Sequence, residues 1–139
     1  MARGIAQAGA RAAAAGVAAW LALGAGPAAA LMPPYVYENA RRDAASVVVL
    51  RVRTVTTPAG GYGACRVSGV VRKVERGPLR PGMVLRLDVP CVKPGAQPPL
   101  GGTIYQPLAA LVRAPYGRAW LDAGGQVVLS QYEQLKQLP

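Results

Sequence analysis

The sequence predicts a mainly β protein, a small antiparallel barrel of five or six strands with a short N-terminal and a short C-terminal helix. Two observations predict the strands: β-branched stretches with alternating polar and apolar residues, and breaks rich in Gly and Pro between them. Helix-forming residues before the first stretch and after the last predict the helices. Short strands at this spacing are typical of a small antiparallel barrel or a sandwich.

The first 30 residues have the order of a secretory signal peptide. Arg3 and Arg11 precede an apolar run over residues 12–25, and a small-residue end closes with Ala30, after which we expect cleavage. Residues 31–139 then form a single exported domain, periplasmic or secreted. The alternative is an uncleaved anchor that tethers the domain, since a helix over residues 12–32 would nearly span a membrane of about 30 Å.

Composition excludes much chemistry. The chain has no His, and so it lacks the usual general base near neutral pH and the commonest metal ligand. Its six acidic residues show no paired spacing, and its Gly pairs lack the Lys and Ser or Thr of a phosphate-binding loop. We therefore expect a noncatalytic protein with no cofactor and no metal.

Cys65 and Cys91 are the only thiols, and both lie in the exported part. An oxidising compartment lets a disulfide persist, and closing a loop of about 27 residues removes chain entropy worth roughly 3.5 kcal/mol. The alternatives are separate thiols or a redox pair, but no CxxC spacing or His lowers a thiolate pKa here. We expect one structural bridge.

The first elements are a helix over residues 35–45 and a strand over residues 46–55. The helix stretch has no Gly or Pro, and the strand stretch is rich in Val. Alternation along the strand places Val48, Leu50 and Val52 on the core face, with Arg51 and Arg53 on the opposite face.

A second strand is expected over residues 64–75, where Gly69 suggests a bulge. Pro81-Gly82 suits the centre of a type II turn, and a third strand follows over residues 83–89. In the third strand the leucines point inward and Arg86 points outward.

The last third of the chain is predicted to contain a loop over residues 92–102 and strands over residues 103–114, 118–122 and 126–129. Ser130 and Glu133 have the spacing of a helix-capping box. A short C-terminal helix through Leu138 is therefore expected.

This order of elements over residues 44–132 resembles the netrin-like domains, which include the tissue inhibitors of metalloproteinases and small exported bacterial relatives. The resemblance lies in residues 47–52, residues 72–77 with Gly82, and Cys91. It implies an OB-like barrel. The inhibitors of that family use a Cys at the mature N-terminus to chelate the protease's zinc, whereas the first Cys here is Cys65, so the resemblance does not imply inhibition.

The exported part is strongly basic, with 14 Lys and Arg against 6 Asp and Glu over 109 residues, a formal charge of +8. Such a surplus favours anionic partners. Cations cluster on the first two predicted strands, and this candidate binding face consists of Arg51, Arg53, Arg66, Arg72, Lys73 and Arg76. The alternative is that these side chains only solvate the outside of a barrel.

The expected partner is an acidic protein or a polyanion in the cell envelope. Nucleic acid is disfavoured, because proteins of this shape stack bases on aromatic side chains, and residues 64–76 and 83–90 contain none. Tyr62 and Tyr116 lie in turns and are candidate exposed contact residues, with packing as the equal alternative. Trp120 is expected in the core.

Overall fold

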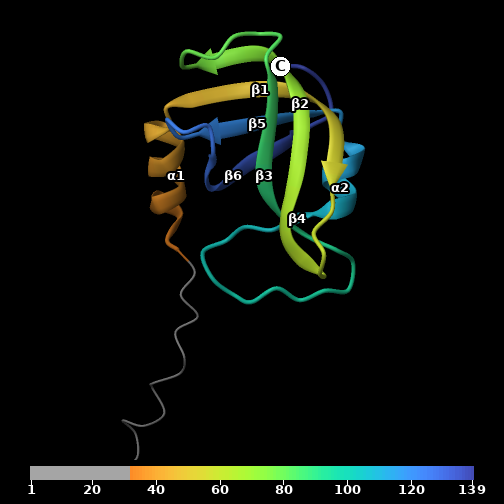
Figure 1. Ribbon diagram of the computed structural model, residues 1–139. Helices are drawn as coiled ribbons and strands as arrows, with labels where there is room; N and C mark the ends of the chain where they lie inside the picture. The colour runs from red at the N-terminus through yellow and green to blue at the C-terminus, as the bar shows by residue number, and fades with distance from the viewer. Residues whose placement is uncertain (1–31) are drawn as a thin grey trace, which may run out of the picture.

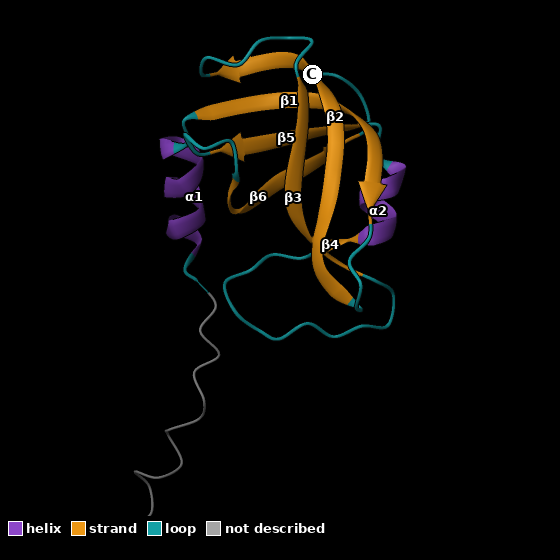
Figure 2. Ribbon diagram, in the orientation of Figure 1, coloured by secondary structure: helices purple, strands orange, loops and turns teal. Residues whose placement is uncertain are grey.

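The computed structural model describes residues 32–139, and the predicted signal peptide at 1–30 lies outside the described residues. Six strands form one curved sheet, and one helix lies at either end of it, as Figures 1 and 2 show. In chain order they are α1 (Pro34–Asp43), β1 (Ser46–Thr56), β2 (Tyr62–Arg76), β3 (Val84–Val92), β4 (Gln106–Pro107), α2 (Leu108–Arg113), β5 (Tyr116–Leu121) and β6 (Val127–Leu135).

The strands lie in the order β4-β3-β2-β1-β5-β6 and curve into a half-barrel. All neighbouring pairs are antiparallel except β3 and β4, which run parallel through Cys91–Gln106 and Val92–Pro107. The sheet is therefore mixed, and the prediction of a purely antiparallel barrel is wrong in this respect. The cause is the loop over residues 93–105, which carries the chain back to the start of β4 so that β4 follows the direction of β3.

The first half of the chain follows the sequence pattern closely. The predicted N-terminal helix and the first three strands are confirmed to within three residues at each end. The turn at Pro81-Gly82 is also confirmed. There the N–H of Met83 donates to the carbonyl of Arg80 at 3.3 Å, and Gly82 has a φ of 94°, as the third residue of a type II turn requires.

A bulge does lie opposite Gly69, but the extra residue is in β1 and not in β2. Val52 pairs with Gly69 and Thr54 pairs with Ser68, so Arg53 has no partner across the ladder. A Cβ at Gly69 would overlap the carbonyl oxygen of Arg51. Glycine is required here because the kinked β1 backbone comes too close for any side chain.

The predicted strand over residues 103–114 is wrong. Only Gln106 and Pro107 are in β4, and α2 begins at Leu108. Pro107 has no N–H to continue a ladder and suits the start of a helix. The six residues that follow are mostly good helix formers, and Leu111 of this helix is buried in the core.

The predicted C-terminal helix is also wrong, because β6 continues to Leu135. Leu129 and Ser130 adopt left-handed backbone angles, with φ values of 40° and 61°, and form a kink within the strand. Beyond the kink, Tyr132 pairs with Ala119 of β5 and is 4% exposed. Burial of this ring and pairing with β5 outweigh the local capping pattern at Ser130.

The main core lies on the inner face of the half-barrel. Its buried members come from β1, β2, β3, β5, β6 and α2: Val48, Leu50, Cys65, Val67, Val71, Leu87, Val89, Cys91, Leu111, Ala119, Leu121 and Tyr132. The predicted disulfide is confirmed, with 5.7 Å between the Cα atoms of Cys65 and Cys91. It ties β2 to β3 from within the core.

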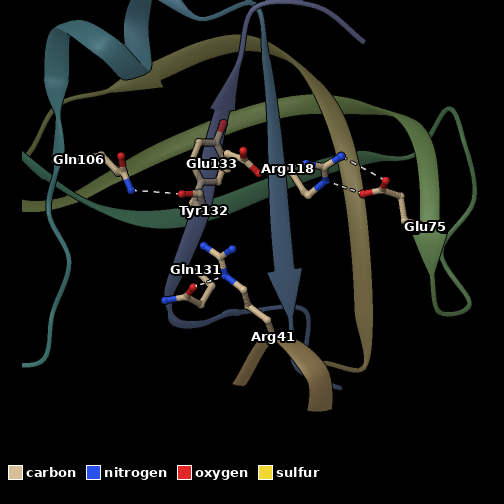
Figure 3. Close-up of polar contacts among 7 residues, drawn as sticks. All are labelled: Arg41, Glu75, Gln106, Arg118, Gln131, Tyr132 and Glu133. Atoms are coloured by element: carbon tan, nitrogen blue, oxygen red, sulfur yellow. Dashed lines mark hydrogen bonds and ion pairs between the residues drawn. The ribbon is translucent and has the colours of Figure 1, made fainter. Parts of the chain in front are cut away.

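The two edges of the sheet are held together by side chains. Gln106 of β4 donates to the carbonyl of Tyr132 at 3.2 Å, and Gln134 of β6 donates to the Gln106 side-chain oxygen at 2.6 Å. Figure 3 shows Gln106 directed at β6. These bonds satisfy polar groups at an edge strand, where unpaired backbone otherwise invites aggregation.

Removal of the disulfide should destabilise the protein. We expect the double variant Cys65→Ala/Cys91→Ala to lose about 2–4 kcal/mol of unfolding free energy, because the unfolded chain regains the entropy of the opened loop. Urea denaturation of the oxidised protein and the variant measures the loss. Reduced wild-type protein should unfold like the variant, and equal midpoints for the variant and the oxidised protein would contradict a stabilising bridge.

Candidate functional site

The outer face of the half-barrel carries most of the predicted basic face. Residues that pair across antiparallel strands project to the same side of a sheet. Val49 of β1 pairs with Lys73 and with Arg118, and Arg51 pairs with Val70 and Tyr116. By the same alternation, four of the six predicted cations share this face: Arg51, Arg66, Lys73 and Arg76. The other two, Arg53 and Arg72, are exposed at register shifts and have no ladder partner.

A hollow of about 300 Å³ opens on this face beside the C-terminal end of α1. Three arginines and two glutamates surround an apolar floor formed by Val47 and Trp120. The charged residues are Arg41, Glu75, Arg76, Arg118 and Glu133. Trp120 is 9% exposed, as expected for a core residue, and packs with Ala44 and Val47 in a second small cluster under the helix.

Arg118 is the centre of the hollow. Its Nε and Nη2 donate to the two carboxylate oxygens of Glu75 at 2.6 and 3.2 Å, and its Nη1 donates to Glu133 at 3.0 Å. Figure 3 shows Arg118 on β5 with Glu75 reaching toward it from β2. Since β1 lies between β2 and β5, this ion pair crosses over β1. It lies above Val49, which is fully buried although it is on the outer face.

The ion pair shifts the titration of both partners. Hydrogen bonding from Arg118 lowers the pKa of Glu75 below its ordinary value, against a smaller opposing effect of burial. Hydrogen bonding to Glu75 raises the pKa of Arg118. Both side chains are charged at neutral pH, and the guanidinium neutralises the carboxylates next to it.

Two further arginines attach α1 to the sheet. Nη1 of Arg76 lies 2.9, 3.0 and 3.0 Å from the carbonyl oxygens of Arg41, Arg42 and Ala44, and so it caps the C-terminus of the helix. The guanidinium of Arg41 lies 4.2 Å from the ring centroid of Trp120, and its Nε donates to the Gln131 side chain at 2.5 Å. Arg76, which the sequence analysis assigns to the binding face, thus attaches α1 to β2.

The remaining predicted cations differ in how they are engaged. Arg66 forms an exposed ion pair with Asp88 at 3.1 Å. Lys73 donates to the carbonyl oxygen of Pro139 at 3.3 Å. Within residues 32–139, five of the six predicted cations make no ion pair with an acid: Arg51, Arg53, Arg72, Lys73 and Arg76.

The two predicted contact tyrosines have different surroundings. Tyr62 at the start of β2 is 43% exposed and meets Tyr105 edge to face at 5.8 Å. Tyr116 is half-buried on the outer face. Its ring centroid lies 5.8 Å from the Arg51 guanidinium, which also donates to its hydroxyl at 3.4 Å. Tyr116 thus belongs to the basic face. Tyr62 does not, since it is the first residue of β2 and contacts Tyr105 in the loop before β4.

The described part of the chain contains no cluster of three or more Cys, Asp or Glu side chains with the geometry to hold a metal. Within that part, no helix combines the length and apolar character needed to cross a bilayer.

The sequence did not indicate the residues that meet at Arg118. Glu75, Arg118 and Glu133 are separated by 43 and 15 positions, and they approach only because β5 pairs with β1. The one local signal is the alternation of Arg118 with the buried Ala119, which marks it as an outward residue of its strand.

No protein-family model, curated protein or solved structure matches this chain.

The Glu75–Arg118 ion pair should make stability sensitive to acid. Because the pKa of Glu75 is lowered in the folded state, its contribution is present above its ordinary value of 4.5 and is lost as pH falls through the lower folded value. We expect Glu75→Gln to cost about 1 kcal/mol at neutral pH and to flatten the decline in stability below about pH 4.5. Urea unfolding from pH 7 to about pH 3 measures both effects.

Glu38 provides the control, since it makes no ion pair within residues 32–139. Glu38→Gln should leave the acid decline as steep as in the wild type. A Glu75→Gln profile that also overlays the wild type would contradict a folded-state role for the ion pair.

Proposed function

We propose that this chain is an exported, noncatalytic binding or accessory module that contacts an acidic protein or a polyanion through its outer sheet face. The observation that carries the proposal is the charge imbalance on β1 and β2. Arg51 and Lys73 lie on one face and make no ion pair with an acid of residues 32–139, and the same holds for Arg53 and Arg72 at the register shifts of these strands. Uncompensated positive charge of this kind raises the local concentration of anions and steers their approach.

The noncatalytic part of the proposal is supported by the state of the two glutamates at the hollow. A general acid near neutral pH needs a raised carboxyl pKa, whereas the pKa of Glu75 is lowered. Arg118 occupies the space between Glu75 and Glu133 and bonds to both. These bonds link β2, β5 and β6, and so the three residues are suited to a structural role.

We further propose that the half-barrel is of the OB type and that the netrin-like resemblance reflects this architecture. Three features support it: β1, β2 and β3 form a meander, α2 lies between β3 and β5, and β5 returns to pair with β1. The edge strand β6 approaches β3, on the side where such a barrel would close. OB barrels serve widely as binding modules.

Export is supported by the disulfide, which persists in oxidising compartments. The alternative function is that of a membrane-tethered structural protein, in which residues 1–30 remain attached. Sequencing the N-terminus of the protein from its native host separates the two. We expect a start near Leu31, and a native chain that begins at Met1 would contradict cleavage and favour the anchor.

Binding to a labelled poly-L-glutamate, which carries the carboxylates of an acidic protein surface, tests the basic face. We expect affinity to fall at least about tenfold between about 0.05 M and about 0.5 M NaCl, because salt screens contacts between exposed charges. The variant Arg51→Gln/Lys73→Gln should weaken binding at low salt at least about fivefold. Fluorescence anisotropy measures both.

The control Arg80→Gln/Lys93→Gln removes the same charge from the β2–β3 turn and from the loop after β3. This control variant should weaken poly-L-glutamate binding by less than about twofold if the outer face binds the polymer. Equal losses in the two variants, or affinity that does not change with salt, would overturn the assignment of this face.

A further inference from the structure

A second and larger hollow lies away from the Arg118 cluster, between α2 and the end of β6. It has a volume of about 500 Å³, within the range typical of small-ligand sites. We call it the α2–β6 groove. It is lined by Ala110, Arg113, Ala114, Pro115, Gln134, Leu135 and Lys136, of which the two cations and Gln134 form a polar rim around an apolar floor.

The helix contributes one face to this groove. Ala110 and Arg113 are three residues apart and lie on one side of α2, and Ala114 follows as the C-terminal cap of the helix. The opposite side carries Leu111, which is 2% exposed and anchors the helix in the core. One wall of the groove is therefore a helix whose orientation is fixed by burial, and the two-residue connection to β5 completes the floor.

The charges at the groove all have one sign. Arg113 and Lys136 are exposed and make no ion pair with any acid of residues 32–139, and no Asp or Glu lines the groove. In the hollow at Arg118, by contrast, Glu75 and Glu133 balance the arginines. A ligand that fits the groove must therefore offer both apolar surface and negative charge.

The floor consists of small and aliphatic side chains with no aromatic ring, which favours an alkyl chain over a flat ring system. Burial of each methylene of such a chain is favourable, so a chain of about eight to ten carbons would contribute most of the affinity.

We propose that the α2–β6 groove binds a single-chain amphiphile with an anionic headgroup, with the chain on the apolar floor and the headgroup between Arg113 and Lys136. The lining of this groove includes none of the cations of the outer face proposed for acidic partners, although the two surfaces adjoin where Leu135 pairs with Tyr116. The groove takes one small molecule, and its occupancy does not require a macromolecular partner.

Titration with decanoate below its micellar concentration tests the proposal on protein expressed from the full chain. We expect saturable shifts of backbone amide NMR signals in α2 and at residues 134–136. Decyltrimethylammonium, which has the same chain and the opposite charge, should bind at least about tenfold more weakly, and acetate should cause no saturable shift. Equal binding of the cationic amphiphile, or shifts that map to another surface, would overturn the proposal.

Two variants separate the roles of the rim and the floor. Arg113→Gln/Lys136→Gln should weaken decanoate binding at least about tenfold, whereas Arg80→Gln/Lys93→Gln, which removes the same charge elsewhere, should leave it within about twofold. Ala110→Leu fills the floor and should reduce binding even with both cations present. Unchanged binding in the rim variant or in Ala110→Leu would contradict the site, provided that the amide spectrum shows an intact fold.

Vesicles of anionic phospholipid distinguish a membrane surface from a free amphiphile. Binding to vesicles without binding to monomeric decanoate would overturn the proposal in favour of a lipid-surface contact. Because Arg51→Gln/Lys73→Gln leaves the groove intact, that variant should bind decanoate like the wild type even if it no longer binds poly-L-glutamate.

Discussion

The structure depends on the burial of β1 on both of its faces. This strand pairs with β2 on one side and β5 on the other, and its residues from Ser46 to Leu50 are all buried. A strand with two buried faces needs cover on the outer face as well as a core on the inner one. Here α1 and Trp120 cover Val47, and the ion pair between Arg118 and Glu75 crosses above Val49.

This constraint divides the arginines of the protein into two groups. Arg41, Arg76 and Arg118 attach α1, β2, β5 and β6 to one another, and each has its donors directed at protein acceptors or at an aromatic ring. Arg51 and Arg53 follow the doubly buried stretch, where the outer face is open to solvent. The excess of positive charge therefore does not correspond to one site, because part of it stabilises the fold and part of it remains available to anions.

The strands with alternating polar and apolar residues could be predicted from the sequence. The elements whose secondary structure depends on contacts with residues far away in the sequence could not. Val48, Leu50 and the alternating residues of β3 identified the core because period-two burial is a local property. The disulfide was predictable because there are only two cysteines. The stretch from Ser130 to Leu135 is a strand since β5 offers it a partner, and the contacts of Arg118 depend on strands far apart in sequence.

The two candidate binding surfaces are continuous with each other. Leu135 of the groove pairs with Tyr116, and Tyr116 pairs with Arg51 of the outer face. Both surfaces carry cations that make no ion pair within residues 32–139, but the hollow of the outer face is lined by Glu75 and Glu133, whereas no acid lines the apolar groove. Salt weakens contacts between exposed charges and leaves apolar burial largely intact. Contact at the outer face should therefore vanish at high salt, whereas a ligand in the groove should retain the part of its affinity that comes from its chain.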